Sequence, residues 1–322
     1  MDFGFPEHGR LRRVLMHAPG PELDRIRPAS YGRYLFEDAV DPVAFRRQHE
    51  HLVDALRGEG VQVALVGDVL RGSPLLERTA RSPNLVYTRD TTTVMPGGGI
   101  RMGMRSPVRR DEPRIVAAAL ERLGVPEVLR IRAPATLEGG DLIFADAGTL
   151  LVGVGNRSSR AALHEVWAYA QTRGLRTIVA VPLPNWAIHL DGTMMIADED
   201  LAIVHPASLR APALVHEPGR PPKRVPLLSL LKRRGFRFVE VTAYERQRRA
   251  TNAITLGPRK LVAYGGHARV RGLLAEEGVD LIEIDGSELV RGGGGPRCMT
   301  APLERGGTSM DSRSTGGGGD EA

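Results

Sequence analysis

The chain has 322 residues, 42% of them hydrophobic, and its 44 Lys and Arg against 38 Asp and Glu give a formal net charge of +6. Its one cysteine excludes an intramolecular disulfide framework and a zinc site built from cysteines, and suits a reducing compartment. No apolar run approaches the roughly 20 residues that span a bilayer, and the N-terminus lacks the apolar segment of a signal peptide, so we expect a soluble, cytoplasmic protein with no membrane partner.

The net positive charge raises nucleic acid as a partner. However, the arginines are spread along the chain, and aromatic residues make up only 5% of it, too few for a platform on which bases stack. We therefore assign most of the charge to solvated surface and expect no nucleic-acid partner.

The first elements in chain order are a strand, a helix and a second strand. Residues 13–17 form a short apolar run typical of a strand. Residues 41–58 begin with an Asp-Pro pair, a typical helix start, and carry apolar residues at helical spacing. Residues 61–66 predict a buried strand, and residues 67–83 predict a connection in which a short helix can form.

The order strand, strand, helix, strand then recurs along the chain. Further strands are predicted at residues 85–87, 91–95, 100–104, 128–131, 141–144, 149–153, 176–181, 193–196, 201–204, 237–241, 253–256, 260–264 and 280–284, and further helices at residues 113–123, 158–172, 227–234 and 268–277. About five such units, roughly 50 to 60 residues each, indicate a repeat architecture. If the units close around an axis, the polar loops that follow their last strands meet at its centre.

We expect a single α/β domain over residues 1–305. From Gly306 onward the chain is rich in glycine and serine and has almost no apolar side chains, so residues 306–322 predict a disordered tail. A homodimer is one assembly that the sequence leaves open.

Four polar clusters lie at the ends of predicted strands. They are residues 84–90 (NLVYTRD), residues 138–141 (EGGD), His189 with Asp191, and the glycine-rich loop that ends in Cys298. Each has an ordinary structural explanation, namely a salt bridge, a turn, a core histidine or a small buried thiol. Together they supply the groups for one reactive centre.

A thiolate nucleophile needs a general acid and base, which His189 supplies, and Glu138 can orient that histidine. Asp90 and Asp191 bring the number of carboxylates around Cys298 to three, which raises the pKa of the thiol unless a cation enters. The substrate should therefore be a cation with several N–H donors, and a guanidinium fits because its planar fork pairs with carboxylates. We expect a largely protonated Cys298 in the empty protein and a thiolate when a guanidinium binds.

The sequence resembles the guanidine-modifying enzymes of the pentein superfamily, and the arginine deiminases most closely, from about Val14 to Leu303. The motifs that carry the resemblance are HAPGPEL at residues 17–23, LFED at residues 35–38, residues 84–90, residues 138–141, HLD at residues 189–191, NAITL at residues 252–256 and GGPRCM at residues 294–299. The resemblance implies an α/β propeller of five ββαβ units with pseudo-fivefold symmetry.

The resemblance also implies the reaction. Cys298 would attack the guanidinium carbon and form a covalent amidino-cysteine, while His189 protonates the departing ammonia and later activates water. Glu138 would assist His189, and Asp90 and Asp191 would clamp the guanidinium nitrogens. The reaction implied is the hydrolysis of arginine to citrulline and ammonia, a step of arginine metabolism, with no metal or organic cofactor.

By the same resemblance, Asn84, Arg109 and Arg157 would hold the α-amino acid head of the substrate. Two arginines suit this task because a pair of guanidinium forks grips a carboxylate well. Tyr87 and Asp141, which lie in the same motifs, complete the expected substrate-binding set.

Two departures from the family pattern leave the identity of the guanidino substrate open. Residues 67–83 are too short for the helical insertion that many bacterial arginine deiminases carry. Gly293 stands five residues before the cysteine, where some deiminases have an arginine.

Other functions remain as alternatives. Dimethylarginine dimethylaminohydrolases share residues 138–141 but usually lack an acidic residue at the position of Asp191, and amidinotransferases typically carry Asp in place of Glu138. Agmatine deiminases have a tryptophan-rich N-terminal signature that is absent here. An alternative of another class is a basic binding protein without catalysis, which has little need for a thiol and an imidazole together.

Overall fold

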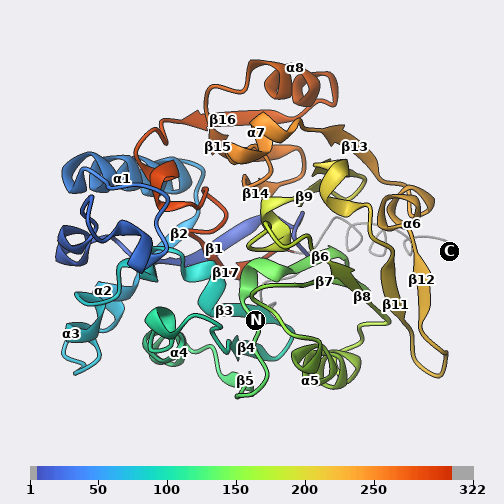
Figure 1. Ribbon diagram of the computed structural model, residues 1–322, viewed down its shortest axis with the longest axis horizontal. Helices are drawn as coiled ribbons and strands as arrows, with labels where there is room; N and C mark the ends of the chain where they lie inside the picture. The colour runs from blue at the N-terminus through green and yellow to red at the C-terminus, as the bar shows by residue number, and fades with distance from the viewer. Residues whose placement is uncertain (1–5, 307–322) are drawn as a thin grey trace, which may run out of the picture.

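The computed structural model describes residues 6–306, which form five small sheets arranged in a ring with helices on its outside (Figure 1). The predicted tail at residues 306–322 lies outside the described residues apart from Gly306, and the single domain over residues 1–305 stays a prediction. Within the described part, no helix combines the length and the apolar character that a membrane span requires.

Each sheet contains the same three-stranded core. An antiparallel pair of strands is followed by a parallel partner, which the chain reaches through a crossover that contains a helix. The five cores have the orders β17-β1-β2, β3-β4-β5, β6-β7-β8, β9-β10-β13 and β14-β15-β16. The predicted α/β propeller of five ββαβ units is therefore confirmed over the described residues.

The strands of these cores are β1 (Leu11–Met16), β2 (Gln62–Leu65), β3 (Thr92–Met95), β4 (Gly98–Arg101), β5 (Glu127–Arg130), β6 (Leu142–Asp146), β7 (Thr149–Val154), β8 (Thr177–Pro182), β9 (Met194–Asp198), β10 (Leu201–Val204), β13 (Arg237–Glu240), β14 (Ile254–Gly257), β15 (Lys260–Tyr264), β16 (Asp280–Ile284) and β17 (Ala301–Arg305). The outer helices are α1 (Pro42–Gly58), α4 (Glu112–Arg122), α5 (Arg160–Gln171), α6 (Leu227–Arg233) and α8 (Ala268–Glu276). Shorter helices are α2 (Val66–Val69), α3 (Leu76–Thr79) and α7 (Ala243–Gln247).

The last strand among the described residues completes the first unit. β17 pairs with β1 in antiparallel fashion, with Pro302 opposite Val14, and β1 pairs in parallel with β2. The sequence did not predict β17, because a five-residue segment with a proline and two charged side chains carries little strand signal of its own. Its pairing brings both ends of the described chain into one sheet.

The structure differs from the sequence-based expectations at two further places. The strand expected at residues 85–87 is wrong, because a 3-10 turn occupies Pro83–Val86 and the Tyr87 N–H donates to the Asn84 carbonyl oxygen over 2.9 Å. A hairpin that was not predicted, β11 (Ala213–His216) with β12 (Lys223–Val225), extends the third sheet through an antiparallel pairing of β11 with β8.

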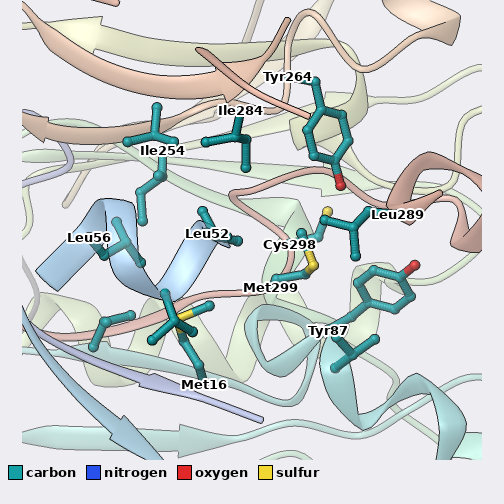
Figure 2. Close-up of a cluster of buried hydrophobic side chains, with 14 of the residues drawn as sticks. Met16, Leu52, Leu56, Tyr87, Ile254, Tyr264, Ile284, Leu289, Cys298 and Met299 are labelled. Atoms are coloured by element: carbon teal, nitrogen blue, oxygen red, sulfur yellow. The ribbon is translucent and has the colours of Figure 1, made fainter. Parts of the chain in front are cut away.

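The core between the units anchors the loop that carries the cysteine. Buried apolar side chains from α1, β14 and β15 surround Met299, which is fully buried. Figure 2 shows Cys298 and Met299 among these side chains, between Leu52 and Leu289, with the ring of Tyr264 above them and that of Tyr87 below. Burial of Met299 therefore fixes the neighbouring thiol at the inner side of the ring.

Candidate active site

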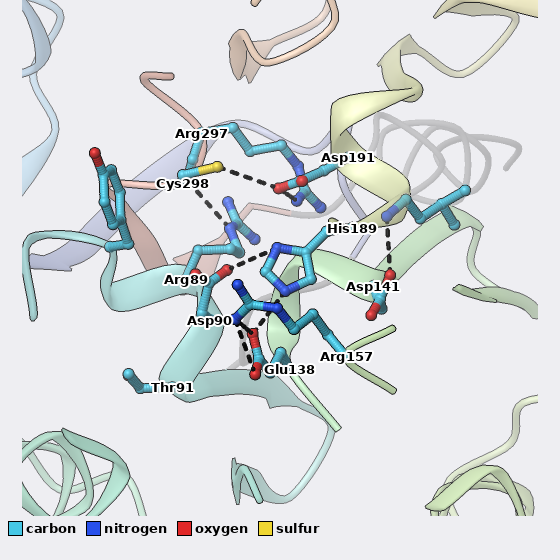
Figure 3. Close-up of polar contacts among 12 residues, drawn as sticks. Arg89, Asp90, Thr91, Glu138, Asp141, Arg157, His189, Asp191, Arg297 and Cys298 are labelled. Carbon is cyan, nitrogen blue, oxygen red and sulfur yellow. Dashed lines mark hydrogen bonds and ion pairs between the residues drawn. The ribbon is translucent and has the colours of Figure 1, made fainter. Parts of the chain in front are cut away.

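The residues expected to carry the reaction lie in the loops that lead into the first strand of four units, whereas Arg109 and Arg157 follow the second strand of their units. Asp90 lies in the turn Thr88–Thr91 before β3, and Glu138 comes directly before the turn Gly139–Asp141 and β6. His189 comes before the turn Leu190–Gly192 and β9, and Cys298 lies shortly before β17. Because these loops occupy equivalent positions in the repeat, they meet at the centre of the ring (Figures 1 and 3).

The fifth unit supplies Asn252, a residue to which the sequence analysis gave no role. Its side-chain oxygen accepts the Cys298 backbone N–H over 3.1 Å, and its amide nitrogen donates to the Asp191 carbonyl oxygen over 3.4 Å. The signal that points to Asn252 is its position before β14, which is equivalent to that of Asp90 before β3. Asn252 thus ties the cysteine loop to the loop of Asp191.

His189 is buried between two carboxylates. Its Nε2 lies 2.8 Å from Glu138 Oε2, and its Nδ1 lies 3.5 Å from Asp90 Oδ1 (Figure 3). The ring approaches the backbone at Gly140, where any Cβ would lie 2.7 Å from His189 Nδ1. Burial lowers the pKa of the imidazole, but Asp90 and the hydrogen bond to Glu138 outweigh burial and raise the pKa of His189 to about 10. The imidazole is therefore a cation at neutral pH.

Cys298 is buried and faces Asp191. The distance from its Sγ to Asp191 Oδ2 is 3.6 Å, and the thiol is only 8% exposed, with the carboxylate of Asp90 also contributing to its electrostatic surroundings. Burial, followed by the charges of Asp191 and Asp90, raises the pKa of the Cys298 thiol well above its usual value. The thiol is therefore protonated in the empty site, in the direction expected from the carboxylates around it.

Each of the two aspartates is held by a buried arginine. Arg297 donates to Asp191 and to Glu7, over 2.9 Å in both cases. Arg109 donates to Asp90 over 2.6 Å and to Glu112 over 2.8 Å. These ion pairs fix both aspartates in position before any substrate enters.

The five residues expected to bind substrate fall into two groups. Asn84, Tyr87, Arg109 and Arg157 line the central cavity. Asp141 is fully buried and is not among the residues that line it. Instead, Asp141 accepts hydrogen bonds from the Ser158 hydroxyl over 2.5 Å and from the Leu190 N–H over 2.9 Å, so it holds the turn that follows His189.

The two arginines expected at the α-amino acid head have partners inside the protein. Arg157 donates to Glu138 Oε2 over 3.1 Å. Besides its two carboxylate partners, Arg109 donates to the carbonyl oxygens of Asn84 and Tyr87. Their contact with a substrate carboxylate stays a prediction.

The cavity at the centre of the ring has a volume of about 470 Å³. Cys298, His189, Asp90 and Asp191 lie in its wall. Residues of the surrounding loops form the rest of the wall, among them Leu35, Glu37, Trp186, Ile188, Arg246, Arg249, Asn252, Gly293 and Gly294. A cation that enters this cavity meets two carboxylates, a thiol and an imidazole together.

Asp90, Glu138 and His189 also offer ligand atoms that lie within 4.8 Å of one another, close enough to hold a metal ion. The surrounding charges fit proton transfer better than metal binding. Arg109 donates to Asp90 and Arg157 donates to Glu138, and these two guanidinium groups would repel a divalent cation.

Comparison with known sequences identifies relatives that match nearly the whole chain. The family model of arginine deiminase matches residues 77–305. An arginine deiminase from Streptococcus agalactiae is 25% identical over 398 aligned positions, which cover 94% of this chain and 97% of that protein. YkgA of Bacillus subtilis, a protein without a characterised function, is 26% identical over 300 positions, which cover 93% of this chain and 94% of YkgA.

Comparison with solved structures gives the same fold. DDAH from Pseudomonas aeruginosa, complexed with citrulline, matches 91% of this chain and 99% of its own with a TM-score of 0.69 and 19% identity. The N-terminal domain of ArgZ, an arginine dihydrolase from the ornithine-ammonia cycle in cyanobacteria, was solved bound to its substrate. It matches 91% of this chain and 98% of its own with a TM-score of 0.71 and 17% identity. These likenesses show that the pentein fold is shared.

Proposed function

The chain belongs to the arginine deiminase family and is a hydrolase of C–N bonds in linear amidines, and from this premise we propose that its substrate is arginine or a close guanidino analogue. The products are then the ureido compound, which is citrulline for arginine, and ammonia. The observation that supports this most directly is the arrangement of charges in the central cavity. Asp90 and Asp191 lie in its wall beside the protonated thiol of Cys298 and the protonated imidazole of His189, so the cavity suits a cationic substrate.

Substrate binding activates the nucleophile in this proposal. The guanidinium donates N–H groups to Asp90 and Asp191, and its positive charge offsets the two carboxylates that raise the pKa of the Cys298 thiol. The thiol proton leaves to solvent, and the thiolate stays beside the guanidinium carbon. His189 keeps its own proton for the next step, because Asp90 and Glu138 stabilise its charged form.

The chemical steps then balance with one water molecule. The thiolate forms a C–S bond to the guanidinium carbon, and His189 gives its proton to the departing nitrogen, so that ammonia leaves and an amidino-cysteine remains. Neutral His189 next takes a proton from water, whose oxygen bonds to the same carbon. The C–S bond then breaks and its electron pair returns to the sulfur of Cys298 as a thiolate. The remaining hydroxyl proton on the carbon passes to solvent, and the neutral ureido product leaves.

The direct test is a panel of guanidino substrates assayed for both ammonia and ureido product. Arginine, methylated arginines, agmatine and guanidino acids are each incubated with the protein and with the Cys298→Ala variant. We expect product from arginine or a close analogue with the wild type and none with the variant. An amine acceptor in a parallel reaction detects amidino transfer, which would contradict hydrolysis, and absence of product from every substrate would favour the non-catalytic binding protein.

Hydrolysis of methylated arginine is the second candidate. The observation that favours it is the length of the chain. The match with DDAH covers 99% of that protein. The alignment with the Streptococcus agalactiae arginine deiminase extends over 398 positions, more than the 322 residues of this chain, so it contains gaps in this chain. Against it stands Asp191, which lies 3.6 Å from the Cys298 thiol, where an N-methyl group would need room. The same panel separates the two candidates.

Cytoplasmic location is part of the proposal and is supported by a lone cysteine that a reducing compartment keeps as a thiol. A homodimer stays a prediction. The roles of Asn84, Tyr87, Arg109, Arg157 and Asp141 toward substrate are likewise proposed. The first four line the cavity, which supports direct contact, whereas Asp141 does not line it and acts through the turn after His189.

A further inference from the structure

Glu112 is a buried carboxylate that has no role in the proposed reaction. It is the first residue of α4, which lies on the outside of the second sheet beside β3 and β4 (Figure 1). Its side chain is 1% exposed, and it is not among the residues that line the central cavity. Glu112 therefore does not touch a substrate in that cavity, and any influence on the reaction passes through a neighbouring side chain.

Arg109 is that neighbour. Its Nε donates to Glu112 Oε2 over 2.8 Å, and its Nη1 donates to Asp90 Oδ2 over 2.6 Å. Its Nη2 donates to the carbonyl oxygens of Asn84 and Tyr87 over 3.2 Å and 3.3 Å. One guanidinium thus joins the start of α4 to the segment that carries Asp90 into the cavity wall.

The buried charges on this side of the cavity are balanced. Three carboxylates face three cations, namely Asp90, Glu112 and Glu138 against Arg109, Arg157 and protonated His189. Among residues 6–306, Glu112 forms an ion pair with Arg109 alone, and its buried Oε1 accepts no hydrogen bond. Without the charge of Glu112, one positive charge in excess would lie beside a cavity that takes up a cation.

The carboxylate of Glu112 changes its charge near neutral pH. Burial raises its pKa, Arg109 opposes burial, and the charges of Asp90 and Glu138 raise the pKa further, to about 7. These three residues are the charged groups that face Glu112. The position in the first turn of α4 favours the charged form, because the N-terminus of a helix carries partial positive charge. Glu112 is therefore mostly charged above pH 7 and mostly neutral below it.

We propose that Glu112 is a positioning residue that acts through Arg109. It holds the Arg109 guanidinium in place and balances its charge, so that Asp90 stays available to the guanidinium of the substrate. This inference rests on the proposed guanidino hydrolysis and adds a residue outside the cavity that sets the affinity for the substrate. Its effect falls on binding, because Glu112 touches neither the substrate nor the reacting atoms.

The test removes the charge of Glu112 and keeps its shape. Glu112→Gln can still accept the Arg109 N–H, so at about pH 8 KM for arginine should rise about tenfold, while kcat changes by less than about twofold. Glu112→Asp keeps the charge on a shorter side chain, and its KM should lie closer to that of the wild type. Glu121→Gln is the matched control, because it removes the same charge from an exposed position on the same helix, and its KM should equal that of the wild type.

The pH dependence separates the charge of Glu112 from its packing. As the pH falls from about 8 to about 6, Glu112 takes up a proton in the wild type, so the ratio of KM in Glu112→Gln to KM in the wild type should shrink toward one. A merely structural role would give a ratio that does not change with pH, and this result would overturn the proposal. Equal KM values at about pH 8 would overturn it too, as would a higher KM in Glu112→Asp than in Glu112→Gln.

The positioning role and the proposed function fail in different ways. If the wild type makes no ureido product from any guanidino compound, the proposed function fails. Glu112 is then tested by the affinity of Cys298→Ala for arginine, measured by calorimetry with and without Glu112→Gln in the same chain. A loss of affinity of about tenfold supports the positioning role, whereas equal affinities, or no binding by either protein, would overturn it.

Discussion

The reaction centre and the mouth of the same cavity are built in opposite ways. At the centre, Glu138 is completely buried and bonds both Arg157 and His189, and Arg297 holds Asp191 from a position that is 2% exposed. At the mouth, Trp186 is 52% exposed and the buried Nε of Arg246 has no hydrogen-bonding partner among residues 6–306.

The difference follows from the part of the repeat that supplies each region. The centre consists of short turns directly before the first strands of the units, which the sheets hold in place. The mouth consists of the longer segment at residues 183–189 and the turn after α7, which lie outside the three-stranded cores. We infer that the packing of the sheets and the buried ion pairs fix the centre, whereas substitutions at the mouth leave that geometry in place.

The largest expected effect comes from breaking an ion pair at the centre. Arg297→Met leaves Asp191 and Glu7 buried without their shared cation, so the free energy of unfolding should fall by about 3–5 kcal/mol. Arg246→Met at the mouth removes a cation that has no buried carboxylate partner. This substitution should change the free energy of unfolding by less than about 1 kcal/mol. Denaturant unfolding measures both variants, and equal losses would contradict the contrast between the two regions.

The second effect is on activity and its pH dependence. Glu138→Gln keeps the shape of the side chain but removes a charge that, together with Asp90, holds the proton on His189. We expect kcat to fall about a hundredfold, the scale of general acid catalysis, and the alkaline limb of its pH profile to move to lower pH. Trp186→Phe at the mouth serves as the control, and the alkaline limb of its pH profile should stay where it is in the wild type. An alkaline limb that stays in place in Glu138→Gln would show that this carboxylate does not set the protonation of His189.

Stability should also depend on pH through His189. In the folded protein the pKa of His189 is about 10, and its ordinary value is 6.5. Because the folded pKa is raised, the stabilisation is fully present below pH 6.5 and is lost as the pH rises through 10, with a slope of at most about 1.4 kcal/mol per pH unit for one proton. Unfolding at a series of pH values should show this decline in the wild type but not in His189→Gln, and parallel curves would argue against a protonated imidazole.

The smallest effect is expected at the mouth. Trp186→Ala removes the ring under Arg246, and a partly exposed cation–π contact is worth about 0.5–1 kcal/mol. The free energy of unfolding should therefore fall by about 0.5–1 kcal/mol, as denaturant unfolding measures, while kcat stays the same. A fall in kcat would mean that the mouth contributes to the chemistry after all.

The recurrence of strand, strand, helix, strand was visible in the sequence, because four of the five units are continuous in the chain. The first unit could not be recognised completely, since β17 pairs with β1 from the far end of the described residues. The turn at Pro83–Val86 was mistaken for a strand because its apolar residues are buried on all sides, which a short run in a strand also shows.

The candidate site, like the fold, could be predicted only in part. The gathering of Cys298, His189 and the carboxylates in one place could be predicted, since their residue types together suggested a nucleophile, an acid and a cation clamp. Their roles in catalysis stay predictions. The partners of the arginines could not, because a sequence rich in arginine does not say which of them is buried. Only the structure shows that Arg297 holds Asp191, and that Arg246 and Arg249 lie at the mouth.

The central claim is that a bound guanidinium converts the Cys298 thiol into a thiolate. Thiolate absorbance in the ultraviolet, recorded across pH with the spectrum of Cys298→Ala subtracted, reports the pKa of this one thiol directly. We predict a pKa well above the usual range in the empty protein, and a fall of that pKa when a guanidinium ligand saturates the site. The same titration curve with and without the ligand would contradict activation by the substrate.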